Sequence, residues 1–118
     1  MNSADFPRAY RLLTPHDYQP VFKQPDIRLS TTHLLVLAKK NNLHHPRLGL
    51  AITKKRAPLA VTRNNIKRHI RNSFRLHKKE LHHYDIVFLL RKNINKQNLA
   101  TIPSETQQCI EQLLAKQA

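Results

Sequence analysis

The chain has 118 residues, a length that fits one domain able to bury a sizeable hydrophobic core. Its single cysteine, Cys109, excludes an intrachain disulfide framework, and no apolar run approaches the roughly 20 residues of a membrane span. Lysine and arginine number 21 against 7 aspartate and glutamate residues, for a formal net charge of +14. Because the N-terminal MNSADFPRAY also lacks the apolar core of a signal peptide, we expect a soluble, cytoplasmic protein.

The positive charge is concentrated in the middle of the chain. Between Asp26 and Glu80 there is no acidic residue, yet fourteen of the 21 basic residues lie there. A folded domain with this charge repels itself, and a polyanion that releases counterions on binding relieves the repulsion. The alternative is a basic surface without a partner, but solubility requires a net charge of only about 2–8. We therefore expect a polyanionic partner.

The first predicted element is a helix in TPHDYQPVFKQ, residues 14–24. Thr14 and Asp17 have the spacing of a capping box, and the proline between them suits the first helical position. Tyr18 and Phe22 are four residues apart and share one helix face. Pro20 lies beyond the first turn, so it should kink or shorten this helix.

Two strands are predicted next, at 33–40 and 47–55, as a pair joined by the turn-forming NNLHHP. A short extra strand is possible at 27–30. Side chains alternate between the two faces of a strand, so the second strand has one bulky face and one small face. The bulky face carries Leu48, Leu50 and Ile52, and the small face carries Gly49, Ala51 and Thr53.

The remaining predicted elements are a helix at about 60–79, a strand at 84–92 and a helix near 104–116. The strand YDIVFLLRK is apolar on both faces, which is typical of a central strand. The order is therefore about α-β-β-α-β-α, an α+β fold in a single domain spanning 1–118. We expect the termini, 1–5 and 116–118, to be flexible.

The helix at 60–79 contains TRNNIKRHIRNSFR and is both basic and amphipathic. A helical wheel places Ile66, Ile70 and Phe74 in a core stripe, with a row of cations beside it, Arg63 at the seam and Asn65 on the far flank. A membrane-surface helix would need a broader, free apolar face. A helix that reads a DNA groove would follow a helix rather than strands. The pattern therefore argues against a membrane-surface helix and against a helix-turn-helix DNA reader.

No constellation in the chain predicts protein-based catalysis. Among the eight histidines none has zinc-site spacing with Cys109, and His69 and His77 are eight residues apart. The acidic residues are too scattered for a two-metal site. We therefore interpret the histidines as polar surface or RNA-contacting residues, and expect no catalytic residue and no metal bound by the protein alone.

The basic helix resembles the signature of the bacterial ribonuclease P protein component, Arg-Asn-x-x-Lys-Arg-x-x-Arg, here Arg63, Asn64, Lys67, Arg68 and Arg71. RLLTPHDYQPVFKQP, HPRLGLAITKK and YDIVFLLRK are similar to other segments of that family, and the resemblance covers about residues 6–115. The chain departs from the family where Asn65 replaces an arginine, where Val36 and Leu37 replace an aromatic found in some members, and at Pro20.

The resemblance implies the protein subunit of an endoribonuclease that removes the 5′ leader from precursor tRNA. Catalysis would belong to the RNA subunit, which requires Mg²⁺ or other divalent ions, and the protein would bind that RNA and the leader, one protein per RNA. It also implies an α/β sandwich with a left-handed βαβ crossover. A structural ribosomal RNA-binding protein is the alternative function, and a self-sufficient nuclease is a third.

Two groups of residues are candidates for these contacts. The predicted RNA-binding residues are Arg63, Asn64, Lys67, Arg68, Arg71, Arg75, Lys54, Lys55 and Arg56. The predicted leader cleft comprises Tyr18, Phe22, Val36, Gly49, Ala51 and Thr53, with the small strand face as its floor. Plain core packing is the alternative role of the two aromatic residues, and we expect Phe22 to be the more buried of them.

Overall fold

The computed structural model describes residues 8–117 of the chain. The elements follow the predicted order, with the short extra strand present. They are η1 (Arg8–Tyr10), α1 (Pro15–Lys23), β1 (Ile27–Ser30), β2 (Leu34–Lys40), β3 (Arg47–Ala51), α2 (Ala60–His77), β4 (Tyr84–Leu90), η2 (Leu99–Thr101) and α3 (Ile102–Lys116). Residues 1–5 and 118, part of the termini expected to be flexible, lie outside the described residues.

The four strands form one sheet in the order β1-β2-β4-β3. β2 is antiparallel to β1 and to β4, whereas β3 is parallel to β4. The predicted pairing of 33–40 with 47–55 is therefore wrong, because β4 lies between these strands, and β3 ends at Ala51 rather than at 55. The physical reason is that β4 is apolar on both faces and is buried most completely at the centre of the sheet.

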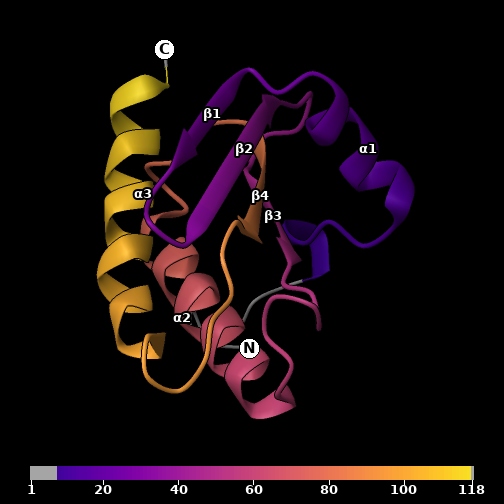
Figure 1. Ribbon diagram of the computed structural model, residues 1–118. Helices are drawn as coiled ribbons and strands as arrows, with labels where there is room; N and C mark the ends of the chain where they lie inside the picture. Colours follow the sequence, from indigo (N-terminus) through magenta and orange to yellow (C-terminus); the bar gives the residue numbers. More distant parts are fainter. Residues whose placement is uncertain (1–7, 118) are drawn as a thin grey trace.

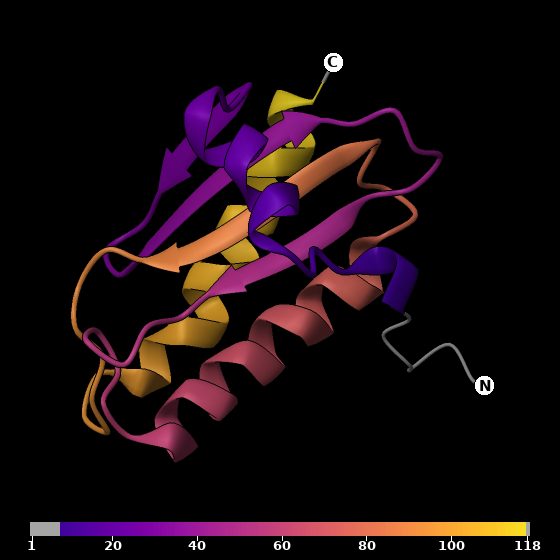
Figure 2. The same cartoon turned by 90° about the vertical axis from the view of Figure 1, so that its right-hand side faces the viewer.

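The sheet is covered on both faces (Figure 1). α2 and α3 pack on one face, and α1 packs on the other. In Figure 2, α1 lies in front of the sheet, β3 and β4 both point to the left, and β4 lies above β3. Since α2 joins these parallel strands across the rear face, the β3-α2-β4 crossover is left-handed, an exception to the usual right-handed connection.

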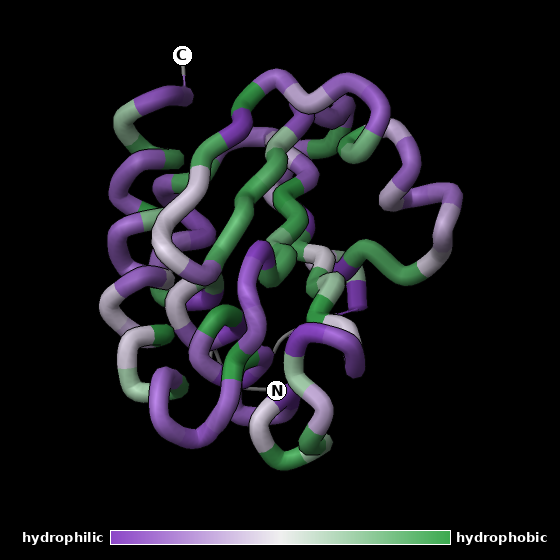
Figure 3. Tube along the Cα trace, in the orientation of Figure 1, coloured by the Kyte–Doolittle hydropathy of each residue, from purple (hydrophilic) through white to green (hydrophobic). Residues whose placement is uncertain are grey.

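The buried face of α2 is the predicted stripe. Ile66, Ile70 and Phe74 are fully buried, and Thr62 extends the stripe by one turn towards the N-terminus. Hydrophobic residues concentrate along the strands, while the helices alternate between the two colours (Figure 3). No helix in residues 8–117 has the length and apolar character needed to cross a membrane.

α1 begins as predicted. The Thr14 hydroxyl accepts the Asp17 amide, and the Asp17 carboxylate accepts the amides of Thr14 and Leu13, at 3.1 and 2.9 Å. These contacts, led by the hydrogen bond from the Leu13 amide, hold the pKa of Asp17 below its usual value. Pro20 lies inside the helix, which ends three residues later at Lys23.

Candidate nucleic-acid interface

The cations of α2 form a row beside its buried stripe. Arg68 and Arg71 are exposed, as is Asn64, while Lys67 and Arg75 are half-buried. Among these arginines, Arg75 donates to the Asn72 side chain at 3.0 Å. Residues Lys67, Arg68, Arg71 and Arg75 are called the cation row below, and the neutral Asn64 lies on the same side of the helix. The positions of the row are those predicted from the helical wheel.

Arg63 differs from the cation row because its guanidinium is turned towards its own chain. Nη1 donates to the carbonyl oxygens of Ala57 and Pro58, both at 2.8 Å. Leu59, the N-cap of α2, offers no side-chain cap, so Arg63 fastens the incoming chain to the first turn of the helix. The first arginine of the signature therefore positions the start of α2 in this structure, and its predicted contact with RNA stays a prediction.

The basic turn at Lys54, Lys55 and Arg56 is held at the same end of α2. The Ala57 amide donates to the Thr53 carbonyl at 3.0 Å, and the Ile94 amide donates to the Arg56 carbonyl at 2.8 Å. The Arg56 side chain donates to Asn93 at 3.3 Å, whereas Lys54 and Lys55 are exposed. The fixed backbone therefore presents two lysines next to the N-terminal end of the cation row.

Three acidic residues are used inside the fold rather than against the cation row. Arg47 forms a bidentate pair with Asp85 at 2.7 and 2.8 Å, and this hydrogen bonding raises the pKa of Arg47. Asp17 caps α1, and Glu105 is buried beneath the β1–β2 turn. Within residues 8–117, no carboxylate lies within salt-bridge distance of the cation row. The row is therefore left for an external anion.

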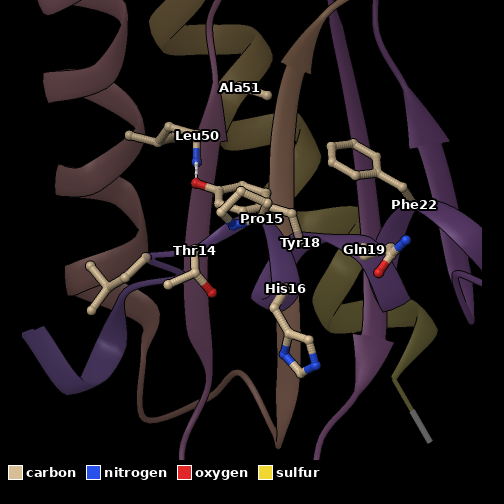
Figure 4. Close-up of a pocket in the computed structure, with 9 residues that line it drawn as sticks. Thr14, Pro15, His16, Tyr18, Gln19, Phe22, Leu50 and Ala51 are labelled. Carbon is tan, nitrogen blue, oxygen red and sulfur yellow. Dashed lines mark hydrogen bonds between the residues drawn. The ribbon is translucent and has the colours of Figure 1, made fainter.

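A groove lies between α1 and β3, on the sheet face opposite α2 (Figure 4). It encloses about 760 Å³ and is lined by Leu13, Thr14, Pro15, His16, Tyr18, Gln19, Phe22, Leu50 and Ala51. The rings of Tyr18 and Phe22 are 6.1 Å apart and 16° from parallel. The Phe22 side chain is exposed, at 44 %, whereas Tyr18 is half-buried. The expectation that Phe22 is the more buried of the two is therefore wrong. Phe22 offers a free aromatic face in this groove.

Tyr18 is fixed to the sheet by its ring and by its hydroxyl. The hydroxyl oxygen accepts the Leu50 amide at 3.2 Å. A Cβ on Gly49 would come within 2.5 Å of the Tyr18 Cε1 and 2.9 Å of the Leu12 Cδ1. The prediction that the small strand face leaves an open floor at Gly49 is therefore wrong. The Tyr18 ring fills that space. Ala51 remains in the lining of the groove.

Two other residues of the predicted cleft lie elsewhere. Val36 is fully buried in the core on the α2–α3 face, whereas its neighbour Leu37 packs on the α1 face. The prediction erred because it did not assign this strand's alternating positions to the correct faces. Thr53 lies past the end of β3, in the turn that contacts Ala57. Neither side chain lines the groove.

The cation row reaches the groove through a smaller hollow of about 120 Å³. This hollow is lined by Arg11, Leu12, Tyr18, Leu48, Leu50, Lys67 and Arg71. Lys67 and Arg71 therefore lie next to the ring that forms one wall of the groove. Sequence reasoning missed this juxtaposition, and it missed His16 and Gln19 in the lining. The helical spacing of Tyr18 and Phe22 could have indicated Gln19, because Gln19 lies next to these two residues on the helical wheel.

Comparisons with known proteins agree over nearly all of this structure. A family model described as Ribonuclease P matches residues 6–114. A ribonuclease P protein component from Haemophilus influenzae is 49 % identical over 96 residues, 81 % of this chain and 80 % of the relative. One from Idiomarina loihiensis is 43 % identical over 100 residues, 85 % of this chain and 80 % of the relative. Among solved structures, the RNase P protein of Staphylococcus aureus superposes with a TM-score of 0.78 at 29 % identity, covering 92 % of this chain and 97 % of that one.

Proposed function

Because this chain belongs to the ribonuclease P protein family, we propose that it is the protein subunit of a ribonuclease P holoenzyme, which removes the 5′ leader of precursor tRNA. The observation that carries the proposal is the hollow shared by Tyr18, Lys67 and Arg71. It connects an aromatic groove with a row of cations, the two parts that binding of a single strand requires. The cellular compartment would be the cytoplasm, and one protein would bind each RNA.

The groove is the proposed binding site for the single-stranded leader. Phe22 presents an exposed ring, and base stacking on such a ring contributes about 1–3 kcal/mol per base. Lys67 and Arg71 lie where they could neutralise phosphates of the same strand. The lining of the groove is largely apolar, and stacking on an aromatic ring tolerates any base. We therefore expect weak base preference.

The cation row and the basic turn are the proposed contact with the RNA subunit. Arginine matches paired phosphate oxygens, and lysine supplies a point charge. If about five cations meet phosphates, the logarithm of the affinity should fall with the logarithm of salt concentration at a slope of roughly −3.5 to −4.5. A slope near zero would show that the row does not take part in binding.

Catalysis is assigned to the RNA subunit. Divalent ions such as Mg²⁺ would stabilise the charge that develops at the scissile phosphate when they are bound in the RNA-containing holoenzyme. Side chains of residues 8–117 provide no cluster of three histidine, cysteine or carboxylate groups that could hold a metal ion. In this proposal the chain binds and positions RNA, and the metal chemistry belongs to the RNA subunit.

Reconstitution tests the proposal. The protein is mixed with a bacterial ribonuclease P RNA at low magnesium, and cleavage of a precursor tRNA is measured. We expect stimulated cleavage at the leader junction, and none from the protein without RNA. Binding of the RNA without stimulation would support a ribosomal-type RNA-binding protein instead, and cleavage by the protein alone would indicate a self-sufficient nuclease.

Phe22→Ala tests the groove directly. The variant should weaken binding of a precursor with a long leader by about 5- to 150-fold, because it loses one stacking contact. A leaderless tRNA should bind as it does to the wild type. Leu76→Ala is the matched control, since Leu76 is 66 % exposed and lies on α2 outside the groove. Equal losses with both RNAs would point to a damaged fold.

A further inference from the structure

Two histidine pairs that are distant from each other in sequence lie together at one end of the molecule. His44 and His45 lie in the loop between β2 and β3, and His82 and His83 lie in the turn that precedes β4. The rings of His44 and His83 are 6.1 Å apart in an edge-to-face arrangement. Figure 2 shows the loop, the turn, η1 and the C-terminal end of α2 together at its right-hand side.

This cluster continues into aromatic and cationic groups that belong to other elements. The ring of His45 is 4.5 Å from the ring of Tyr10 in η1. The Lys78 ammonium, just past α2, lies 4.8 Å from the centre of the same tyrosine ring. His44, His45, His82, His83, Tyr10 and Lys78 are called the histidine surface below. Through Lys78 it extends the cation row beyond the end of α2.

The backbone beneath the histidine surface is fixed, while most of its imidazoles are accessible. The Asn41 amide donates to the His83 carbonyl at 2.7 Å, and the His82 amide donates to the Gln117 side chain at 2.9 Å. His44, His82 and His83 are exposed. His45 is half-buried, with Nδ1 at 3.0 Å from the Pro46 carbonyl. Three imidazoles are therefore presented to solvent from a rigid support.

The charged groups around these imidazoles are mainly positive. Lys40 and His83 line the same hollow, and Lys79 is exposed in the segment before the turn. Asp85 on β4 is held by Arg47 of β3 and by the Asn41 side chain. Glu80 is exposed, and His77 contacts the Ser73 carbonyl at 2.9 Å. Tyr84 lines the same hollow as Lys40, and the exposed Asp26 carboxylate accepts the Lys40 amide at 2.8 Å. Glu80 and Asp26 are therefore the exposed carboxylates near these imidazoles among the described groups named here, against Lys40, Lys78 and Lys79.

We propose that the histidine surface is a second RNA-binding surface, whose affinity for the RNA subunit increases as its imidazoles take up protons. Histidine side chains generally gain charge between pH 8 and pH 5, and a protonated imidazole donates from both nitrogens to phosphate oxygens. The continuity with the cation row favours the RNA subunit over the leader, and the inference rests on the proposed function in taking RNA as the partner.

The test measures binding to a bacterial ribonuclease P RNA, without substrate, at pH 8.0 and pH 6.0. Wild-type protein should bind about three- to tenfold more tightly at pH 6.0, because up to three additional cations meet phosphates. Its salt-dependence slope should steepen by about 2 over the same interval. The triple variant His44→Gln, His82→Gln, His83→Gln should lose most of both effects and still bind like the wild type at pH 8.0.

Lysines at the same three positions provide the converse variant. The triple variant His44→Lys, His82→Lys, His83→Lys should bind at pH 8.0 about as tightly as the wild type does at pH 6.0. His69→Gln, on the opposite flank of α2 from Lys67, is the control for loss of a histidine elsewhere. Thermal unfolding at both pH values shows whether each variant is folded before its binding is compared.

Several outcomes would overturn the inference. An equal pH response in the wild type and the glutamine variant would assign the effect to other groups. A response that appears only when zinc chloride is added would make the imidazoles metal ligands rather than RNA contacts. A protein that stimulates cleavage fully but binds RNA independently of pH would refute this inference alone. Absence of RNA binding at both pH values would refute the proposed function as well.

Discussion

Replacing Arg63 by alanine should destabilise the fold more than it affects the charge of the RNA-binding surface. Nη1 of Arg63 donates to two carbonyl oxygens, those of Ala57 and Pro58, at 2.8 Å each. Ala57 is fully buried, and Leu59 supplies no side-chain cap to α2. Within residues 8–117, the Arg63 guanidinium is the side chain that donates hydrogen bonds to these two carbonyls, and the substitution removes it.

The expected cost follows from those contacts. A hydrogen bond from a charged donor contributes about 1.5–3 kcal/mol when buried. The two acceptors share one nitrogen, and Arg63 is only half-buried, so we expect a total loss of about 1–3 kcal/mol. In a chain of this length, such a loss lowers the melting temperature by about 4–12 °C. Arg63→Lys should fall between alanine and wild type, because an ammonium lacks the planar fork.

Urea and thermal unfolding of the two variants and the wild type measure this loss. Arg68→Ala is the matched control, since Arg68 lies on the same helix, is exposed and makes no recorded hydrogen bond to the rest of residues 8–117. It should change stability by less than about 0.5 kcal/mol. Equal stabilities for Arg63→Ala and Arg68→Ala would refute the assignment of Arg63 as a positioning residue.

Three further substitutions test other contacts. Gly49→Ala should destabilise the protein by about 1–3 kcal/mol in urea unfolding, because the added Cβ would overlap the Tyr18 ring and a methyl group of Leu12. An unchanged stability would show that Tyr18 moves freely. Burial opposes the ionisation of Glu105, but hydrogen bonds from Thr31, the His33 amide and Thr101 outweigh it and lower its pKa to about 2. A depressed pKa contributes stability that is present above the unfolded value and lost as pH falls towards 2. Glu105→Gln should therefore cost about 2–3 kcal/mol at pH 7 and flatten the loss of stability between pH 5 and pH 2, and a parallel pH profile would contradict this. Asn65→Ala should stabilise the protein by about 0.5–1 kcal/mol in thermal unfolding. The buried Asn65 Oδ1 has no hydrogen-bond partner among the described residues, and alanine favours the helical conformation. A loss of stability would imply a partner for that oxygen.

Much of the fold was predictable because it depends on local patterns. The capping box of Thr14 and Asp17, the buried stripe of α2 and the largely apolar β4 are each encoded in a few neighbouring residues. The pairing of strands was not predictable in this way. β2 and β3 are adjacent in sequence but are separated in space by β4, a choice that depends on long-range packing.

The candidate site shows the same division. The positions of the cation row followed from helical spacing, whereas the use of Arg63 depends on a loop whose path the spacing does not specify. Val36 was assigned to the wrong side of the sheet, since alternation indicates two faces but not which one meets α1. The glycine in β3 was correctly singled out, but its space is taken by Tyr18 rather than left open.

The sequence by itself determined the charge, the amphipathic helices and the family signature, because these depend on residue type and short-range spacing. Tertiary structure alone decided that Tyr18, Lys67 and Arg71 share a hollow, since they come from elements separated by three strands in the chain. It likewise brought two separate histidine pairs to one end of the molecule. The physical reason is that burial of the apolar faces sets the position of each helix, and the polar side chains are carried along with it.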